Sequence, residues 1–327
     1  MQSPIDLAIL HDLASFRRSS AIRQTWNSND VPLEVATLIV DELALEGVVG
    51  LRSCLFLSRT FRDRARTHIF KSIEISDSWT YDRVKQLLHI LGPSAGGGVG
   101  PFVQEFSIKL STFLFFATSD QTLLLLSLST AVNEHSEHLF DDNDGTLADI
   151  LDKIHGSDYG VTSFSMEYRN DEIGGGPNWL NFSTYLERSI RNLLASPGLR
   201  SLCLKNIHNL PTTIFHGAHI MHLHLENAHF KKSGKVLTFT ASGDFVMIDP
   251  DSNALPPPQI TSLRVRNALP LLCFSVDPQH NNLPSAISDV RSLEVVAAGP
   301  AYLTQMKSIV EKTATTIESL KLTFEGQ

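Results

Sequence analysis

Cysteine, positive charge and long apolar runs are scarce in this sequence, and each shortage excludes a class of protein. The three cysteines among 327 residues, Cys54, Cys203 and Cys273, lie far apart and form no Cys-x-x-Cys pair. A disulfide framework and a cysteine zinc site are therefore excluded, and a reducing compartment fits best. Lysine and arginine number 27 against 35 acidic residues, a net charge of −8. This balance argues against nucleic acid as a partner.

Apolar runs are too interrupted to suggest a membrane protein. The most apolar window, residues 113–132, contains eight polar residues, with Asp120 near its middle. That is too many for a membrane span of about 20 residues. The first basic pair, Arg17-Arg18, follows a short apolar run instead of preceding one, the reverse of a secretory signal. We expect no membrane partner and an intracellular protein, cytoplasmic or nuclear.

The sequence also lacks strings that mark several catalytic and cofactor sites. It has no His-Glu-x-x-His string and no phosphate-binding Gly-Lys-Ser string. The glycine-rich stretch 96–100 follows an expected helix, residues 81–91, and precedes an expected strand, the reverse of the order in a dinucleotide-binding loop. The acidic run 141–145 has no glutamate where a calcium loop closes. We expect no cofactor and no catalytic residue.

A polar extension, residues 1–30, leads into a short region of helix signals, residues 31–75. Pro32 and Glu34 suit a first helical turn, and Val35, Leu38, Ile39 and Leu43 recur at helical spacing. The pattern predicts an amphipathic helix, and residues 51–70 predict a second helical segment that ends in a charged stretch, two or three helices in all. A group of about 45 residues is too small to be stable alone, so it should pack on a neighbour, a partner or both.

One apolar pattern recurs through residues 76–327 and at the end of the helical region. An apolar residue is followed by two free positions, an apolar residue, one free position and a third apolar residue. The bare pattern also arises by chance about 24 times at this apolar content, but several copies have turn residues before them and expected helices, 81–91 and 302–312, between them. Eight copies begin at Phe70, Val103, Val161, Leu199, Ile220, Ile260, Val290 and Ile317.

This rhythm of strand, loop, helix and strand predicts an irregular leucine-rich-repeat-like solenoid with a parallel curved sheet. The fold class expected is therefore α/β. The asparagine that usually follows such strands is not found at its usual place, which Ile207 and Ala228 occupy.

The stretch HGAHIMHLHLENAHF, residues 216–230, packs five histidines and a glutamate into fifteen positions. In a strand, His222, His224 and Glu226 alternate with two leucines and therefore share one face. Two interpretations follow, half of a zinc or iron site, or an exposed strand face that contacts a target. The second is favoured because no further ligand pair at metal spacing occurs.

The helical region resembles an F-box, most closely that of the large fungal families. The resemblance rests on Val31-Pro32-Leu33-Glu34-Val35 with Ile39, then on Leu51, Cys54 and Leu57-Ser58-Arg59 with Phe61, and on His68-Ile69-Phe70. It covers about 45 residues. Val31 stands where the family usually has Leu, and Phe61 where it usually has Trp. Members of the family carry irregular leucine-rich-like strands after the F-box, as expected here.

The resemblance implies the substrate-recognition subunit of a Skp, cullin and F-box ubiquitin ligase. A Skp-type adaptor, and through it a cullin, would bind the helical region, and an unknown protein target would bind the solenoid. Some of the implied contact residues could instead hold the helices together. Two alternatives remain, a metal-dependent enzyme using His222, His224 and Glu226, and an interaction protein whose F-box no longer binds the adaptor. The implied adaptor-binding residues are Val31, Pro32, Leu33, Val35, Ile39, Leu43, Leu51, Leu55, Leu57 and Phe61.

Overall fold

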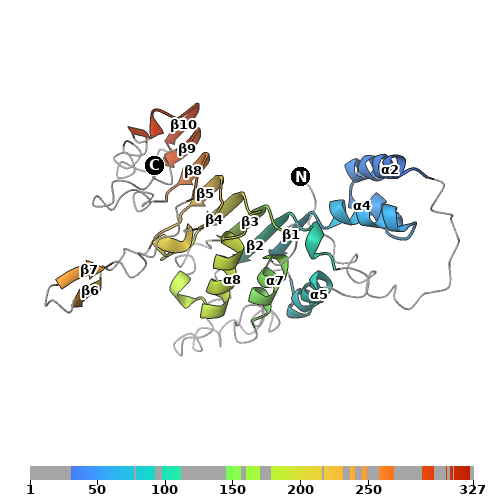
Figure 1. Cartoon of the computed structure of the whole chain (residues 1–327), viewed down its shortest axis with the longest axis horizontal. Coiled ribbons are helices and arrows are strands. Elements are labelled where there is room, and N and C mark those ends of the chain that lie inside the picture. The colour runs from blue at the N-terminus through green and yellow to red at the C-terminus, as the bar shows by residue number, and fades with distance from the viewer. Residues whose placement is uncertain are drawn as a thin grey trace, which may run out of the picture.

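A computed structural model describes residues 31–76, 79–92, 98–111, 145–155, 160–169, 178–215, 217–230, 236–239, 245–248, 258–268, 289–297, 307, 310–311 and 313–324. In these residues the chain is an α/β protein with six α-helices and one eight-stranded parallel sheet (Figure 1). The strands lie in chain order: β1 (Ser72–Ser76), β2 (Glu105–Ser111), β3 (Ser163–Arg169), β4 (Ser201–Lys205), β5 (His222–Glu226), β8 (Ser262–Arg266), β9 (Ser292–Ala297) and β10 (Ser319–Phe324).

The predicted apolar pattern locates every strand of this sheet. Each strand begins two residues after the first apolar residue of its copy, as β4 does after Leu199. The second and third apolar residues of the pattern are the second and fourth residues of the strand, and in β4 these are the buried Leu202 and Leu204. The strands pair in register, so the apolar residues stack across the sheet into one core. The expected parallel sheet is confirmed.

Three helices cover one face of the sheet, α5 (Tyr81–Leu91), α7 (Thr146–His155) and α8 (Thr184–Leu194) (Figure 1). Helix α8 shows how the sequence produces this layer. Ser183 caps its N-terminus by accepting a hydrogen bond from the Leu186 backbone N–H at 3.1 Å. Its apolar side chains recur at helical spacing and are buried against the sheet. Helix α5 has the bounds predicted for it from the sequence.

The N-terminal helices, α2 (Leu33–Glu46), α3 (Val48–Cys54) and α4 (Arg59–Ile69), form a separate group beside β1, here called the helical unit (Figure 1). The sequence predicted a helical segment over 51–70 in a group of two or three helices, and the structure has three, because α3 ends at Cys54 and α4 begins at Arg59. Ser58 starts α4 by accepting a hydrogen bond from the Phe61 N–H at 3.5 Å. The hydrophobic core is continuous from α2 to the sheet, which anchors the unit.

Smaller elements connect the main ones. These are three 3₁₀ helices, η2 (Gly100–Phe102), η5 (Trp179–Asn181) and η6 (Thr212–Phe215), and an antiparallel hairpin of β6 (Val236–Phe239) and β7 (Phe245–Ile248). The hairpin lies in the chain between β5 and β8, which pair directly. The apolar window 113–132, the acidic run 141–145 and most of the helix expected over 302–312 lie outside the described residues.

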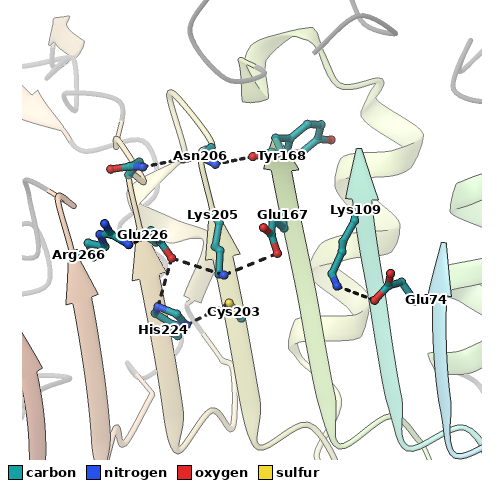
Figure 2. A network of polar contacts seen from close by, with 11 residues as sticks. Glu74, Lys109, Glu167, Tyr168, Cys203, Lys205, Asn206, His224, Glu226 and Arg266 are labelled. Carbon is teal, nitrogen blue, oxygen red and sulfur yellow. Dashed lines mark hydrogen bonds and ion pairs between the residues drawn. The ribbon is translucent and has the colours of Figure 1, made fainter. Parts of the chain in front are cut away.

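Asparagines end three neighbouring strands, β4, β5 and β8. Asn206, Asn227 and Asn267 directly follow these strands with φ of 56°, 48° and 49°, a left-handed conformation that asparagine tolerates. Ile207 and Ala228 do occupy the place where the repeat asparagine was sought, as the sequence indicated, and the asparagines stand one residue earlier. Their side chains link strands: Asn227 Nδ2 donates to Asn206 Oδ1 at 2.7 Å, and Asn206 Nδ2 donates to the Tyr168 carbonyl (Figure 2).

Replacement of Asn206 tests this asparagine link. Asn206→Ala removes a hydrogen-bond donor and an acceptor, and alanine tolerates a positive φ less well than asparagine does. We therefore expect a loss of about 2–3 kcal/mol in unfolding free energy. Asn206→Gly keeps the conformation and should recover roughly 1 kcal/mol of that loss. Urea unfolding followed by circular dichroism measures both. If the alanine variant has the wild-type midpoint, the link contributes nothing to stability.

Candidate functional site

The face of the sheet opposite the helices, here called the open face, is formed by the first, third and fifth residues of each strand. No described helix covers it. His222, His224 and Glu226 are the first, third and fifth residues of β5, so they share the open face as the sequence predicted. His222 is exposed, whereas His224 and Glu226 are half-buried among their neighbours.

Opposite charges alternate along the open face. The fifth residues of β2, β3, β4, β5 and β8 are Lys109, Glu167, Lys205, Glu226 and Arg266. Lys205 Nζ lies 3.6 Å from Glu167 Oε2 and 3.5 Å from Glu226 Oε2 (Figure 2). Opposite charges on adjacent strands attract, each pair contributing about 0.2–1 kcal/mol. This row, the charge ladder, therefore favours the observed register.

Further ion pairs balance the charges on the strands at both ends of the charge ladder. Glu74 on β1 pairs with Lys109 at 2.7 Å. On the other side, Glu294 pairs with Arg264 at 3.3 Å and with Lys321 at 2.8 Å. These two cations hold the pKa of Glu294 below its usual value, with the Lys321 hydrogen bond the larger cause. Each described lysine or arginine at the third or fifth position of a strand of this sheet thus has an acidic partner.

His224 is neutral at pH 7. Burial lowers its pKa, and the nearby charges of Arg264 and Lys205 lower it further. Its Nε2 lies 3.8 Å from Glu226 Oε2, so this contact is not an ion pair when the ring is neutral. Its Nδ1 lies 3.3 Å from the Sγ of Cys203 on the adjacent strand (Figure 2). His224 therefore serves as a packed, uncharged member of the open face.

The metal interpretation of β5 receives no support from this geometry. Glu226 is engaged by Lys205 and by Arg266, whose Nη1 donates to Glu226 Oε1 at 3.0 Å. Among the described residues, no group of three or more His, Cys, Asp or Glu side chains is arranged to hold a metal ion. The metal-dependent enzyme therefore remains a hypothesis from the sequence alone.

The described cysteines are poor nucleophiles. Burial raises the pKa of the Cys54 thiol, and it is also the main cause of the raised pKa of Cys203. Both side chains are therefore protonated thiols at neutral pH, whereas nucleophilic attack needs the thiolate. Cys273 lies outside the described residues.

The sequence contains one string of a catalytic type that its patterns were not taken to include. Residues 92–96 read Gly-Pro-Ser-Ala-Gly and match the spacing of a nucleophile elbow. An elbow needs a strand before the serine and a helix after it. Here helix α5 precedes the string, and residues 93–97 lie outside the described part of the chain. The context is the wrong one for an elbow.

Exposed large apolar side chains concentrate on the helical unit. Nine of the fourteen among the described residues lie between positions 31 and 57. Helix α2 is apolar on more than one side: Ala36 and Val40 are buried, whereas Leu33, Leu38 and Leu45 are 62%, 62% and 81% exposed. The nine, here called the apolar surface, are Val31, Leu33, Val35, Leu38, Ile39, Leu45, Val49, Phe56 and Leu57.

The residues implied as adaptor contacts divide into two groups. Exposed are Val31, Pro32, Leu33, Val35, Ile39 and Leu57. Leu51 and Leu55 are buried, and Leu43 and Phe61 are half-buried against the core. The second group therefore holds the helices together, the other role that the sequence left open.

Helical spacing alone did not show which side of α2 is covered. Of the predicted set Val35, Leu38, Ile39 and Leu43, only Leu43 packs against the core, and the other three are exposed. Sequence reasoning missed Leu45, Val49 and Phe56 on the apolar surface. Their apolar character was visible, but a helix that is apolar on two sides does not reveal which side is covered.

Asp41 fastens α2 to α4. Arg64 donates two hydrogen bonds to its carboxylate, Nε to Oδ1 and Nη2 to Oδ2, both at 2.7 Å. His68 Nε2 lies 2.8 Å from the same Oδ1. The Arg64 hydrogen bond is the main cause that lowers the pKa of Asp41 from 3.8 to about 2. This cluster orients the helices that present the apolar surface.

None of the helices in the described part of the chain combines the length and apolar content needed to span a membrane. Comparisons of the chain with protein-family models, with curated proteins and with solved structures gave no match.

Removing the charge of Asp41 should destabilise the protein in a pH-dependent way. A lowered folded-state pKa stabilises the fold above the unfolded value of about 4, and this contribution disappears as pH falls towards 2. Asp41→Asn should therefore lower the unfolding free energy at pH 7. The loss should be only about 1 kcal/mol, because the cluster is partly exposed and solvent screens its charges. The difference from wild type should shrink between pH 4 and pH 2.

Urea midpoints across this pH range measure the effect. Glu42→Gln, at an exposed neighbouring position of the same helix, is the matched control and should behave as wild type. An equal loss at pH 7 and at pH 2 for Asp41→Asn would mean that lost packing, not lost charge, is responsible.

Proposed function

We propose that this protein is the substrate-recognition subunit of a Skp, cullin and F-box ubiquitin ligase. The helical unit is the F-box and binds a Skp-type adaptor, which links the chain to a cullin. The parallel sheet with its helices is an irregular leucine-rich-repeat-like solenoid, and its open side binds the protein to be modified. The subunit contributes proximity and orientation, and other subunits carry out ubiquitin transfer.

The apolar surface is the observation that carries this proposal. A concentration of large exposed apolar side chains on a small helical group is typical of a site of protein association. Six of the ten residues that the F-box resemblance implied as adaptor contacts are exposed in this region. The remaining four pack inside the unit, where they hold the three helices in place for such a partner.

The departures from the family string are compatible with adaptor binding. Phe61 replaces the usual Trp, but it packs against the core of the unit and is not part of the apolar surface. The replacement therefore changes internal packing more than the surface that a partner meets. Val31 keeps an apolar group at the edge of the surface, with 36% exposure. Loss of adaptor binding is thus the less supported alternative.

Co-expression with a Skp-type adaptor, followed by size-exclusion chromatography, tests the proposal. We expect wild type to co-elute with the adaptor. A Leu33→Asp, Ile39→Asp double variant should elute without it, because two desolvated carboxylates would oppose burial of the apolar surface.

The matched control is Leu180→Asp, Met221→Asp. These side chains are 56% and 39% exposed, close to the 62% and 43% of Leu33 and Ile39, but lie outside the helical unit. The control should keep the adaptor. Circular dichroism confirms that each variant is folded. A folded wild type that elutes alone in the presence of the adaptor overturns the proposal.

A further inference from the structure

A groove runs along the edge of the sheet where strands β4, β5, β8 and β9 begin. Its volume is about 640 Å³. Its central residues, Arg200, Met221, Thr261 and Arg291, each directly precede a strand. Backbone hydrogen bonds join them in sequence, the N–H of each of the last three donating to the carbonyl of the one before it at 2.8–2.9 Å.

These backbone hydrogen bonds fix the spacing of the two arginines. Adjacent strands lie about 4.8 Å apart, so Arg200 and Arg291, three strands apart, are separated by roughly 14 Å at the backbone. An extended peptide advances about 3.3 Å per residue, so residues four apart in such a peptide span nearly the same distance. Met221, 39% exposed, lies between the arginines and offers an apolar contact.

The charges of the groove differ from those of the charge ladder. Arg200 is exposed, and its side chain makes one hydrogen bond, from Nη1 to the His219 carbonyl at 3.4 Å, with no ion pair to a described acidic residue. Arg291 pairs with Glu318 at 3.5 Å, but both side chains are about two-thirds exposed. Such a pair is weak and exchanges readily with another carboxylate. Asp289 also lines the groove and disfavours a ligand that is acidic along its whole length.

We propose that this groove binds an extended acidic segment of the target, with two carboxylate side chains four residues apart and an apolar side chain between them. Arg200 forms a bidentate pair with the first carboxylate, and Arg291 exchanges Glu318 for the second. The apolar side chain lies on Met221. The inference deepens the proposed target-recognition role and rests on it.

Fluorescence anisotropy with the full chain alone tests the groove without the adaptor, so its result is independent of the co-elution experiment. The probes are labelled peptides Glu-Ser-Leu-Ser-Glu, Gln-Ser-Leu-Ser-Gln and Lys-Ser-Leu-Ser-Lys. We expect saturable binding of the acidic peptide below about 1 mM and at least about tenfold weaker binding of the other two.

Variants assign the binding to the arginines. Arg200→Ala should weaken binding of the acidic peptide about tenfold or more, and Arg200→Lys by less, because lysine keeps the charge but lacks the planar fork. Arg264→Ala, an exposed arginine of the open face outside the groove, is the control and should bind as wild type. Arg200 is exposed, so its variants should fold, which circular dichroism verifies.

Any of four results overturns the proposal. One is the absence of saturable binding of the acidic peptide up to about 1 mM. Another is equal binding of the acidic and glutamine peptides, and a further one is wild-type binding by the folded Arg200→Ala variant. The fourth is tighter binding of a labelled oligothymidine than of the acidic peptide, which would assign the groove to nucleic acid.

Discussion

The in-register pairing of parallel strands is the constraint on which the rest of this molecule depends. Because the second and fourth residues of the strands from β1 to β9 in the parallel sheet stack inward, a single register produces one continuous core. The same register places the fifth residues in a row, where opposite charges alternate from Lys109 to Arg266. A slip of one residue would bury these charges and expose the leucines, so packing and electrostatics specify the same arrangement.

Sequence reasoning located the strands because the physics of a buried strand is local. An apolar residue such as Leu199 before the strand and two inside it are enough to mark the element and its inward side. Pairing is not local, and the ion pairs joining Lys205 to Glu167 and Glu226 depend on which strands become neighbours. Asn206 was overlooked for a related reason. Its role depends on a positive φ, and the repeat pattern expects its asparagine one residue later, at position 207.

The helical unit shows where such reasoning stops. Helix α2 has apolar residues on more than one side, and periodicity alone did not show that Ala36 and Val40 face the core while Val35 and Ile39 are exposed. Which side turns inward is decided by tertiary contacts, among them the Asp41 cluster that ties α2 to α4. Small inward residues let the helices approach closely, which leaves the larger apolar side chains outside, where a protein partner would cover them.

The two candidate binding regions therefore follow different physical rules. The apolar surface gains affinity from desolvation, which is largely indifferent to ionic strength, and suits a constant partner. The groove at the strand edge offers guanidinium groups with weak or no internal partners, and such groups discriminate between ligands by charge and geometry. The open face is already charge-compensated by its own ion pairs. If the proposed function holds, the apolar surface would serve permanent assembly and the groove selective recognition, the division that a target-selecting subunit requires.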